Sequence, residues 1–274
     1  MIKIKTVFAV IDPTRESQRA LDRAIHIARI ARARVHVYVC IHTDLETEDT
    51  DALAMAETAR YQLWVDRIIK QLDVEDLEVT SQIEWNKNWR EAIAAAAREV
   101  NSDLIVKPSR SHSASERLFI NSSDLALFNQ AMCPILLIKS DQPISSHTVL
   151  IAIDAKREDK KYNTIKEKII DFGKAVAAAY DDGELYAVHA YTSQDDYVHV
   201  TDLARVARLD SKNVRVVGEE PEQAIAKIAA EVNAQLVIIG LSTKSTLVNR
   251  VFGSTGEWLL NNLSQDLMVI FPEE

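Results

Sequence analysis

The chain has 274 residues, which suits two domains of ordinary size, and 47% of its residues are hydrophobic. No run approaches the roughly 18 uncharged apolar residues of a membrane helix, and the apolar run before Asp12 is too short for a secretory signal. The two cysteines lie in apolar surroundings, which argues against a disulfide framework. The formal net charge of −9 argues against a nucleic-acid partner. We therefore expect a cytoplasmic protein without nucleic-acid or membrane partners.

Apolar runs of strand length alternate with helical patterns along the whole chain. The first half predicts helices at about 15–32, 51–72, 89–101 and 122–131, and strands at 4–11, 35–41, 79–85, 103–107 and 135–139. The second half predicts the same alternation, with a short helix near 200–208 and strands at 148–153, 184–191, 213–217, 235–239 and 267–271. The strands are apolar throughout, which indicates parallel sheets buried on both faces. We predict an α/β fold of two tandem Rossmann-like domains, each a five-stranded parallel sheet with helices on both faces.

The two halves are copies of one another. The segment TVFAVID at 6–12 matches TVLIAID at 148–154, and residues 90–108 match residues 222–240, with the run Glu-Val-Asn in common. The match continues to the end, where CPILLIK at 133–139 corresponds to QDLMVIF at 265–271. Because the polar segment SDQPISSH between the copies has the composition of a linker, we place the domains at 1–142 and 143–274.

Glycine is scarce, with six residues in total, and none precedes Gly173. A loop that surrounds a phosphate uses glycine because backbone N–H groups must approach the anion closely. Such a loop is therefore expected only in the second half, where Gly240 follows a strand and Gly253-Ser254-Thr255 opens a helix. The helix N-terminus and the hydroxyls favour an anion, and Lys244 and Arg250 would add positive charge. A second interpretation stays open, in which Gly253 only permits a turn and Ser254 only caps the helix.

These residues resemble the signature of the universal stress protein family. In that family the fourth strand is followed by Gly-x2-Gly-x9-Gly-(Ser/Thr), and an Asp closes the first strand. Gly240, Gly253 and Ser254 match the motif at the right spacing, while Thr243 replaces its second glycine. Asp154 matches the aspartate on the adenine side. The resemblance covers the whole chain twice and is greatest to the tandem, E-type members, whose domains have the adenine nucleotide alpha hydrolase-like fold.

By this resemblance the second domain binds an adenine nucleotide, ATP or AMP, at the carboxyl ends of its strands. The implied nucleotide-binding residues are Ala152, Ile153, Asp154, Ala190, Ile239, Gly240, Ser242, Thr243, Lys244, Arg250, Gly253, Ser254 and Thr255. No catalytic residue is implied, and no metal ligand is expected because the histidines and cysteines lack metal-ligand spacings. His189, on a buried strand, is expected to be a core histidine with its polar atoms satisfied.

The first copy departs from the motif. At the positions of Gly240, Thr243, Gly253 and Ser254 it has Pro108, Ser111, Asn121 and Ser122. Pro108 lacks an N–H, and Asn121 puts a side chain where the backbone would approach a phosphate. Asp12 is retained and would then only cap the following helix, while Lys107, Arg110, His112 and Arg117 are typical of a solvated loop. We interpret the first domain as degenerate for nucleotide; its Trp85 and Trp89 either line an apolar cavity or pack between helix and sheet.

The resemblance implies a cytoplasmic stress-response protein that acts through conformation or a partner and is at most a weak ATPase. Because family members pair through their fifth strands, the strands at 135–139 and 267–271 are expected to pair within this chain as a pseudo-dimer, with a homodimer as a further possibility. Two other classes stay open. The chain could bind an apolar or lipid-like metabolite without using nucleotide, or it could be a nucleotide-hydrolysing or adenylyl-transferring enzyme. Residues 12–19 lack the His-x-Gly-His type of loop that such enzymes use.

Overall fold

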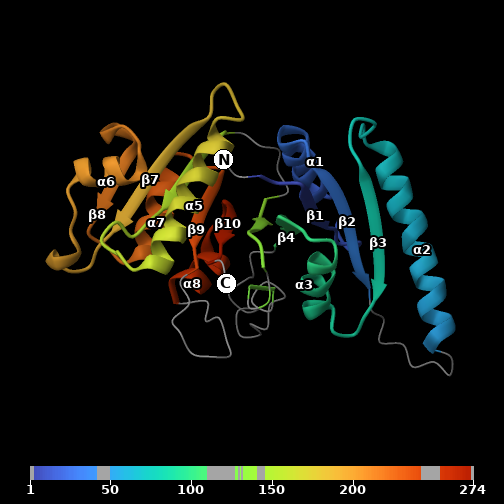
Figure 1. Cartoon of the computed structure of the whole chain (residues 1–274). Coiled ribbons are helices and arrows are strands. Elements are labelled where there is room, and N and C mark those ends of the chain that lie inside the picture. The colour runs from blue at the N-terminus through green and yellow to red at the C-terminus, as the bar shows by residue number, and fades with distance from the viewer. Residues whose placement is uncertain are drawn as a thin grey trace. The chain divides into compact units, whose positions relative to one another are not determined.

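The computed structural model describes residues 3–41, 50–109, 127–128, 130, 132–140, 146–241 and 254–272 (Figure 1). The chain divides into two compact units. The N-terminal unit comprises residues 3–108 and the described residues between 127 and 133. The C-terminal unit comprises Ser109 and the described residues from Pro134 onward.

The N-terminal unit is a parallel sheet with helices packed on it. Its elements are β1 (Thr6–Val10), α1 (Arg19–Ala31), β2 (Arg34–Ile41), α2 (Thr50–Gln71), β3 (Val79–Trp85), α3 (Trp89–Glu99) and β4 (Leu104–Pro108). The strand order is β3-β2-β1-β4, and each neighbouring pair is parallel. The predicted strands and helices agree with these elements, except for the helix predicted at 122–131, most of which lies outside the described residues.

The core of this unit is built around β1, all of whose residues are buried. The Phe8 ring lies against the rings of His36 and Tyr38 on β2, with centroid distances of 5.5 and 5.1 Å. On α1 the buried residues recur at the spacing of one helical face: Ala20, Leu21, Ala24, Ile25 and Ala28. Burial of both faces of β1 explains why its sequence is apolar at every position.

The C-terminal unit contains β5 (Ile135–Ile138), β6 (Thr148–Ala152), α5 (Lys160–Ala177), β7 (Glu184–Ala190), η2 (Gln194–Asp196), α6 (Val200–Ala207), η3 (Ser211–Asn213), β8 (Val214–Val217), α7 (Pro221–Glu231), β9 (Leu236–Gly240), α8 (Ser254–Asn262) and β10 (Asp266–Ile270). Its strand order is β5-β10-β9-β6-β7-β8. The five strands from β10 to β8 are parallel, as predicted for the second domain.

The helices that precede β4 and β9 end in the same way. Asn101 and Asn233, from the repeated Glu-Val-Asn run, have φ values of 51° and 50°. Asn tolerates this left-handed conformation better than most residues. The N–H of the next residue then bonds back to a helix carbonyl, at 3.0 Å after α3 and 2.8 Å after α7. The repeated sequence thus produces a repeated helix end that turns the chain into the following strand.

The strand β5 belongs to the first repeat by sequence but to the C-terminal unit by its contacts. It pairs antiparallel with β10, with Leu136 opposite Met268. Just beyond β5, the Lys139 N–H donates to Oδ1 of the buried Asp266 at 3.0 Å. The predicted pairing of the two fifth strands is therefore confirmed. It covers an edge of β10 whose backbone groups would otherwise be open to other chains.

Candidate functional site

The strand order of the C-terminal unit reverses between β6 and β9. From β6 the chain builds β7 and β8 on one side, whereas β9 and β10 lie on the other. Because these strands are parallel, their carboxyl ends meet at one edge, and open α/β sheets bind ligands outside such a switch point. The residues after β6, from Ile153, together with Gly240 at the end of β9, therefore form the described part of the candidate site.

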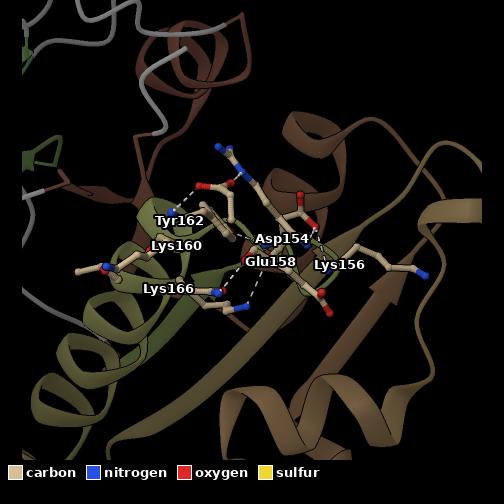
Figure 2. A network of polar contacts seen from close by, with 10 residues as sticks. Asp154, Lys156, Glu158, Lys160, Tyr162 and Lys166 are labelled. Atoms are coloured by element: carbon tan, nitrogen blue, oxygen red, sulfur yellow. Dashed lines mark hydrogen bonds and ion pairs between the residues drawn. The ribbon is translucent and has the colours of Figure 1, made fainter. Parts of the chain in front are cut away.

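The turn after β6 is organised by Asp154 (Figure 2). The N–H of buried Ile153 still bonds to Val188 on β7, at 3.0 Å. The Oδ1 atom of Asp154 then accepts the backbone N–H groups of Lys156 and Arg157, at 3.1 and 3.2 Å. An aspartate that accepts hydrogen bonds from the residues just after it holds a compact turn. Asp154 therefore shapes the chain at the end of β6.

Tyr162, near the start of α5, holds the Asp154 turn through a hydrogen bond. Its Oη accepts the N–H of Asp154 at 2.5 Å. Burial of the ring raises the pKa of Tyr162 to about 12, so the hydroxyl is neutral at physiological pH. The start of α5 is itself capped, because the Asp159 carboxylate accepts the Tyr162 N–H at 2.9 Å. That bond and the Arg157 guanidinium lower the pKa of Asp159.

Positive charge is concentrated in the same segment. Residues 156–166 contain Lys156, Arg157, Lys160, Lys161 and Lys166 against only Glu158 and Asp159. The Arg157 guanidinium lies 4.8 Å from the Tyr162 ring centroid, and the Lys166 ammonium lies 5.9 Å from it. Figure 2 shows Lys166 and Tyr162 in this segment. Sequence analysis did not identify these cations, although the run KREDKK directly after the matched aspartate was a signal for them. Arg157 pairs with Asp159, and the carboxylates of Asp154 and Glu167 flank the segment, so the excess of positive charge is confined to these residues.

His189 supports the turn from β7. Its ring is buried, and Nε2 lies 2.9 Å from the carbonyl oxygen of Asp196. A carbonyl can only accept, so Nε2 carries the hydrogen, and Nδ1 accepts the Ala155 N–H at 3.2 Å. This assigns the neutral tautomer from the bonding partners. The expectation of a core histidine with satisfied polar atoms is confirmed, and the structure adds that its partner is the loop of the candidate site.

Gly240, the last residue of β9, lies directly under α5. A Cβ at this position would be 2.4 Å from Cγ2 of Ile165 and 2.9 Å from Cδ1 of Ile169. Its φ lies outside the left-handed region, so close packing rather than an unusual backbone angle requires glycine here. Sequence analysis considered Gly240 only as part of a phosphate loop. The packing role lies in a contact between residues 75 positions apart, which no local pattern reveals.

The helix α8 comprises Ser254–Asn262, and Ser254, its first described residue, is exposed. The hydroxyl of Thr255 donates to Oε2 of Glu222, at the start of α7, with a distance of 2.8 Å. This bond ties the first turn of α8 to α7. The hydroxyl of Thr255 therefore has a carboxylate acceptor, whereas Ser254 stands at the exposed helix N-terminus.

Of the other residues predicted to bind nucleotide, three lie at strand ends of the candidate site and five lie outside the described residues. Ala152, Ala190 and Ile239 lie at or next to the carboxyl ends of β6, β7 and β9. Five of the predicted residues lie outside the described part of the chain: Ser242, Thr243, Lys244, Arg250 and Gly253.

Aromatic rings follow β7 at the carboxyl edge of the sheet. Tyr191 comes directly after Ala190, and its ring centroid lies 5.4 Å from that of Tyr197 in an edge-to-face arrangement. The Tyr197 ring packs in turn against His199, at 5.3 Å. Beside them, a Cβ at Gly218 would lie 3.0 Å from the Tyr191 hydroxyl. These rings border the carboxyl ends of β7 and β8 and offer faces on which a planar ligand can stack.

The equivalent edge of the N-terminal unit also has an aspartate that holds its own turn, as Asp154 does. Oδ1 of Asp12 accepts both the N–H and the hydroxyl of Thr14, at 2.9 and 2.6 Å. The expectation that Asp12 caps the next helix is wrong, because α1 begins after Gln18 and the Asp12 carboxylate closes its own turn instead. The Lys107 ammonium is buried and donates to the Pro108 carbonyl at 3.0 Å.

The expectations for the tryptophans and cysteines of the N-terminal unit can be compared with their burial. Trp85 and Trp89 are both half-buried. Desolvation raises the pKa of the Cys40 and Cys133 thiols to about 11; Cys133 is buried and Cys40 is half-buried. In the part of the chain described here, His, Cys, Asp and Glu side chains form no group able to hold a metal ion. No described helix has the length and apolar character needed to cross a membrane.

The fold is that of a tandem α/β protein, with a candidate site at the switch point of its second half. Comparison with known proteins agrees along the full length. The chain is 21% identical to the universal stress protein E homolog of Haemophilus influenzae, covering 100% of this chain and 99% of that protein. It is 20% identical to universal stress protein E of Escherichia coli K12, covering 100% of this chain and 96% of the other.

Solved structures show the same fold. A universal stress protein from Archaeoglobus fulgidus superposes with a TM-score of 0.76 at 15% identity, covering 98% of this chain and 97% of that one. A protein of unknown function from Pseudomonas aeruginosa superposes with a TM-score of 0.75 at 19% identity, covering 98% and 93%. The sequence profile of the universal stress protein family matches residues 3–139 and 175–270. The chain therefore belongs to the universal stress protein family, as a tandem member similar to the E type throughout its length.

Proposed function

We propose that the second repeat, residues 143–274, binds one adenine nucleotide, ATP or AMP, and that the protein acts in a cytoplasmic stress response through conformation or a partner. The observation that carries the proposal is the Asp154 turn at the switch point. Its N–H groups are held by Tyr162 and by His189, from two different elements. A turn fixed in this way is preorganised, so little conformational entropy is lost when a ligand is bound.

The base side of the proposed site is the end of β6 and β7. Ala152, Ile153 and Ala190 are small or apolar, and the Tyr191 ring stands beside them in sequence and at the same sheet edge. An adenine ring has an apolar face that stacks on aromatic side chains. The carboxylate of Asp154 is about half exposed and can accept a hydrogen bond from the base or sugar.

The phosphate side is the N-terminal end of α8, and the cations after Asp154 are proposed to contribute to it. Ser254 is exposed at the start of this helix, where backbone N–H groups and the helix dipole favour an anion. The segment 156–166 adds the positive side chains described above, and Lys244 and Arg250 are expected to add two more. These groups suit the negative charge of one or more phosphates.

We propose that the first repeat, residues 1–142, holds no nucleotide. Pro108 replaces the glycine at the end of the fourth strand, and the Lys107 ammonium donates to a backbone carbonyl. Asp12 holds its own turn as Asp154 does, so the aspartate does not distinguish the two repeats. The expected stoichiometry is therefore one nucleotide per chain.

Calorimetric titration with ATP and AMP tests this function. Gly253→Glu puts a carboxylate where phosphate oxygens would meet backbone donors, and losing two charge-assisted hydrogen bonds weakens binding by at least about a hundredfold. The matched control is Asn121→Glu in the first repeat, which should leave affinity unchanged. Two nucleotides per chain, or equal losses from both substitutions, would contradict the assignment. No binding at millimolar ATP would favour the apolar-metabolite class instead.

A further inference from the structure

The helix α2 is buried far less than the other long helices. It has 22 residues, of which only Val65 is fully buried, whereas the 13-residue α1 buries five. It runs beside β3, at the edge of the N-terminal sheet (Figure 1). A helix of this length is stabilised mainly by packing of an apolar face, so a largely uncovered one invites a partner.

Its outer side carries an ordered row of side chains. Asp51, Met55, Ala59, Leu63 and Arg67 follow one another at intervals of four residues, and all five are exposed. Met55 is 75% exposed and Leu63 is 68% exposed, the two largest values among the exposed large hydrophobic side chains. Ala52 and Ala56 are exposed beside this row. Large apolar side chains so fully exposed, in a row, mark a surface for contact with another protein.

The row has a two-fold pattern. Around the central Ala59, an apolar residue stands four positions away on each side, and a charged residue stands eight positions away on each side. The charge is negative toward the N-terminus, at Asp51, and positive toward the C-terminus, at Arg67. Such a row is complementary to itself when it is turned end to end. Self-complementarity is the requirement for an isologous interface between two copies of one chain.

We propose that α2 is a homodimer interface, in which its outer row packs antiparallel against the same row of a second copy. Residues four apart form the ridges that interdigitate in the commonest class of helix packing, with an interaxial angle of about −50°. Ala59 stands at the crossing, where its small side chain permits close approach of the two helices.

The antiparallel arrangement then determines the contacts on either side of the crossing. Met55 packs against Leu63 of the second copy, and Asp51 faces Arg67 of the second copy. The two-fold axis makes each contact twice, and the helix dipoles run in opposite directions. Because a single pair of helices makes a small interface, the dimer is expected to be weak, dissociating in the micromolar range.

Sedimentation analysis of the full chain, from low micromolar to several hundred micromolar, tests the apolar part of the row. Leu63→Lys removes an apolar contact and adds a charge at both ends of the interface, so we expect the dissociation constant to rise by at least about tenfold. Ile30→Lys is the matched control, because Ile30 is 50% exposed on α1 and lies off the row. It should leave the dimer unchanged.

A charge exchange tests the orientation. Asp51→Arg and Arg67→Asp each place like charges opposite one another twice, and each alone should weaken the dimer by roughly tenfold. An equimolar mixture of these two variants should recover the affinity of the original chain, because every pair in the mixed dimer is again opposite in charge. A helix damaged by either substitution would not recover on mixing, so the mixture separates loss of contact from loss of folding.

A chain that stays monomeric at the highest concentration would overturn the proposal. So would a dimer that survives Leu63→Lys, since the interface would then lie elsewhere. A mixture no tighter than the separate charge variants would overturn the antiparallel orientation. Nucleotide affinity is measured separately and has no part in these outcomes.

Discussion

Leu136 and Met268 lie opposite one another in the antiparallel β5–β10 pair, and they occupy equivalent positions in the two repeats. On either side of them Ile135 faces Val269 and Leu137 faces Leu267, so the register is symmetric about the central pair. Two copies of one repeat would form the same symmetric contact as a homodimer. The tandem chain makes this contact within itself.

The first prediction concerns this strand pair. Leu136→Ala and Met268→Ala should each lower the free energy of unfolding by about 2–5 kcal/mol, because both side chains are buried. Since the two residues face each other, the double variant should differ from the sum by about 0.5–3 kcal/mol. Urea denaturation measures all three. Leu136→Ala combined with Leu150→Ala is the control, because β6 lies three strands from β5 and the two effects should add.

The second prediction concerns Gly240. A Cβ there would overlap Ile165 on α5, so Gly240→Ala should lower the free energy of unfolding by about 1–3 kcal/mol. Gly218→Ala is the comparison, because its Cβ would meet only the far end of the Tyr191 side chain at 3.0 Å, which can move. Equal stability of Gly240→Ala and the original chain, with weaker nucleotide binding, would show that phosphate contact rather than packing requires this glycine.

The third prediction concerns Tyr162. Tyr162→Phe keeps the ring but removes the acceptor of the Asp154 N–H, a half-buried donor, and should cost about 1–3 kcal/mol of unfolding free energy. If the Asp154 turn binds nucleotide as proposed, the affinity for ATP measured by calorimetry should fall as well. Tyr186→Phe is the control, because its hydroxyl contacts only the exposed Glu184. A loss of stability without any change in affinity would place the ligand away from this turn.

The fourth prediction concerns the two thiols. Burial raises the pKa of Cys40 and Cys133 from 9.0 to about 11, and the thiolate is the species that reacts. At pH 8 the folded protein should therefore be alkylated about a hundredfold more slowly than the urea-unfolded chain, and the rate should rise about tenfold for each pH unit up to about 11. Mass spectrometry of iodoacetamide-treated protein measures the rates. Rapid modification of the folded chain at pH 8 would contradict the raised pKa of these thiols.

The repeats explain how much of the fold was predictable. Apolar runs such as 148–153 reveal strands because a strand buried on both faces is apolar at every position. The shared Glu-Val-Asn run marked equivalent positions, and the structure shows that both Asn residues end a helix in the left-handed conformation. In the candidate site the Asp154 position and the start of α8 were predicted from local motifs. Tyr162 and the cations after Asp154 were missed, although they are close in sequence, because their roles depend on how α5 folds back onto the turn.

The sequence by itself determined the tandem organisation, the order of strands and helices along the chain, and the parallel character of the sheets. These properties follow from local periodicity, since backbone geometry ties the spacing of apolar residues to the kind of element they form. Only the tertiary structure decided that His189 holds the Asp154 loop and that Gly240 makes room for α5, whereas the pairing of β5 with β10 was already expected from the family resemblance. Each of these depends on side chains or backbone groups brought together from distant positions by assembly of the sheet, and such contacts leave no periodic trace in the chain.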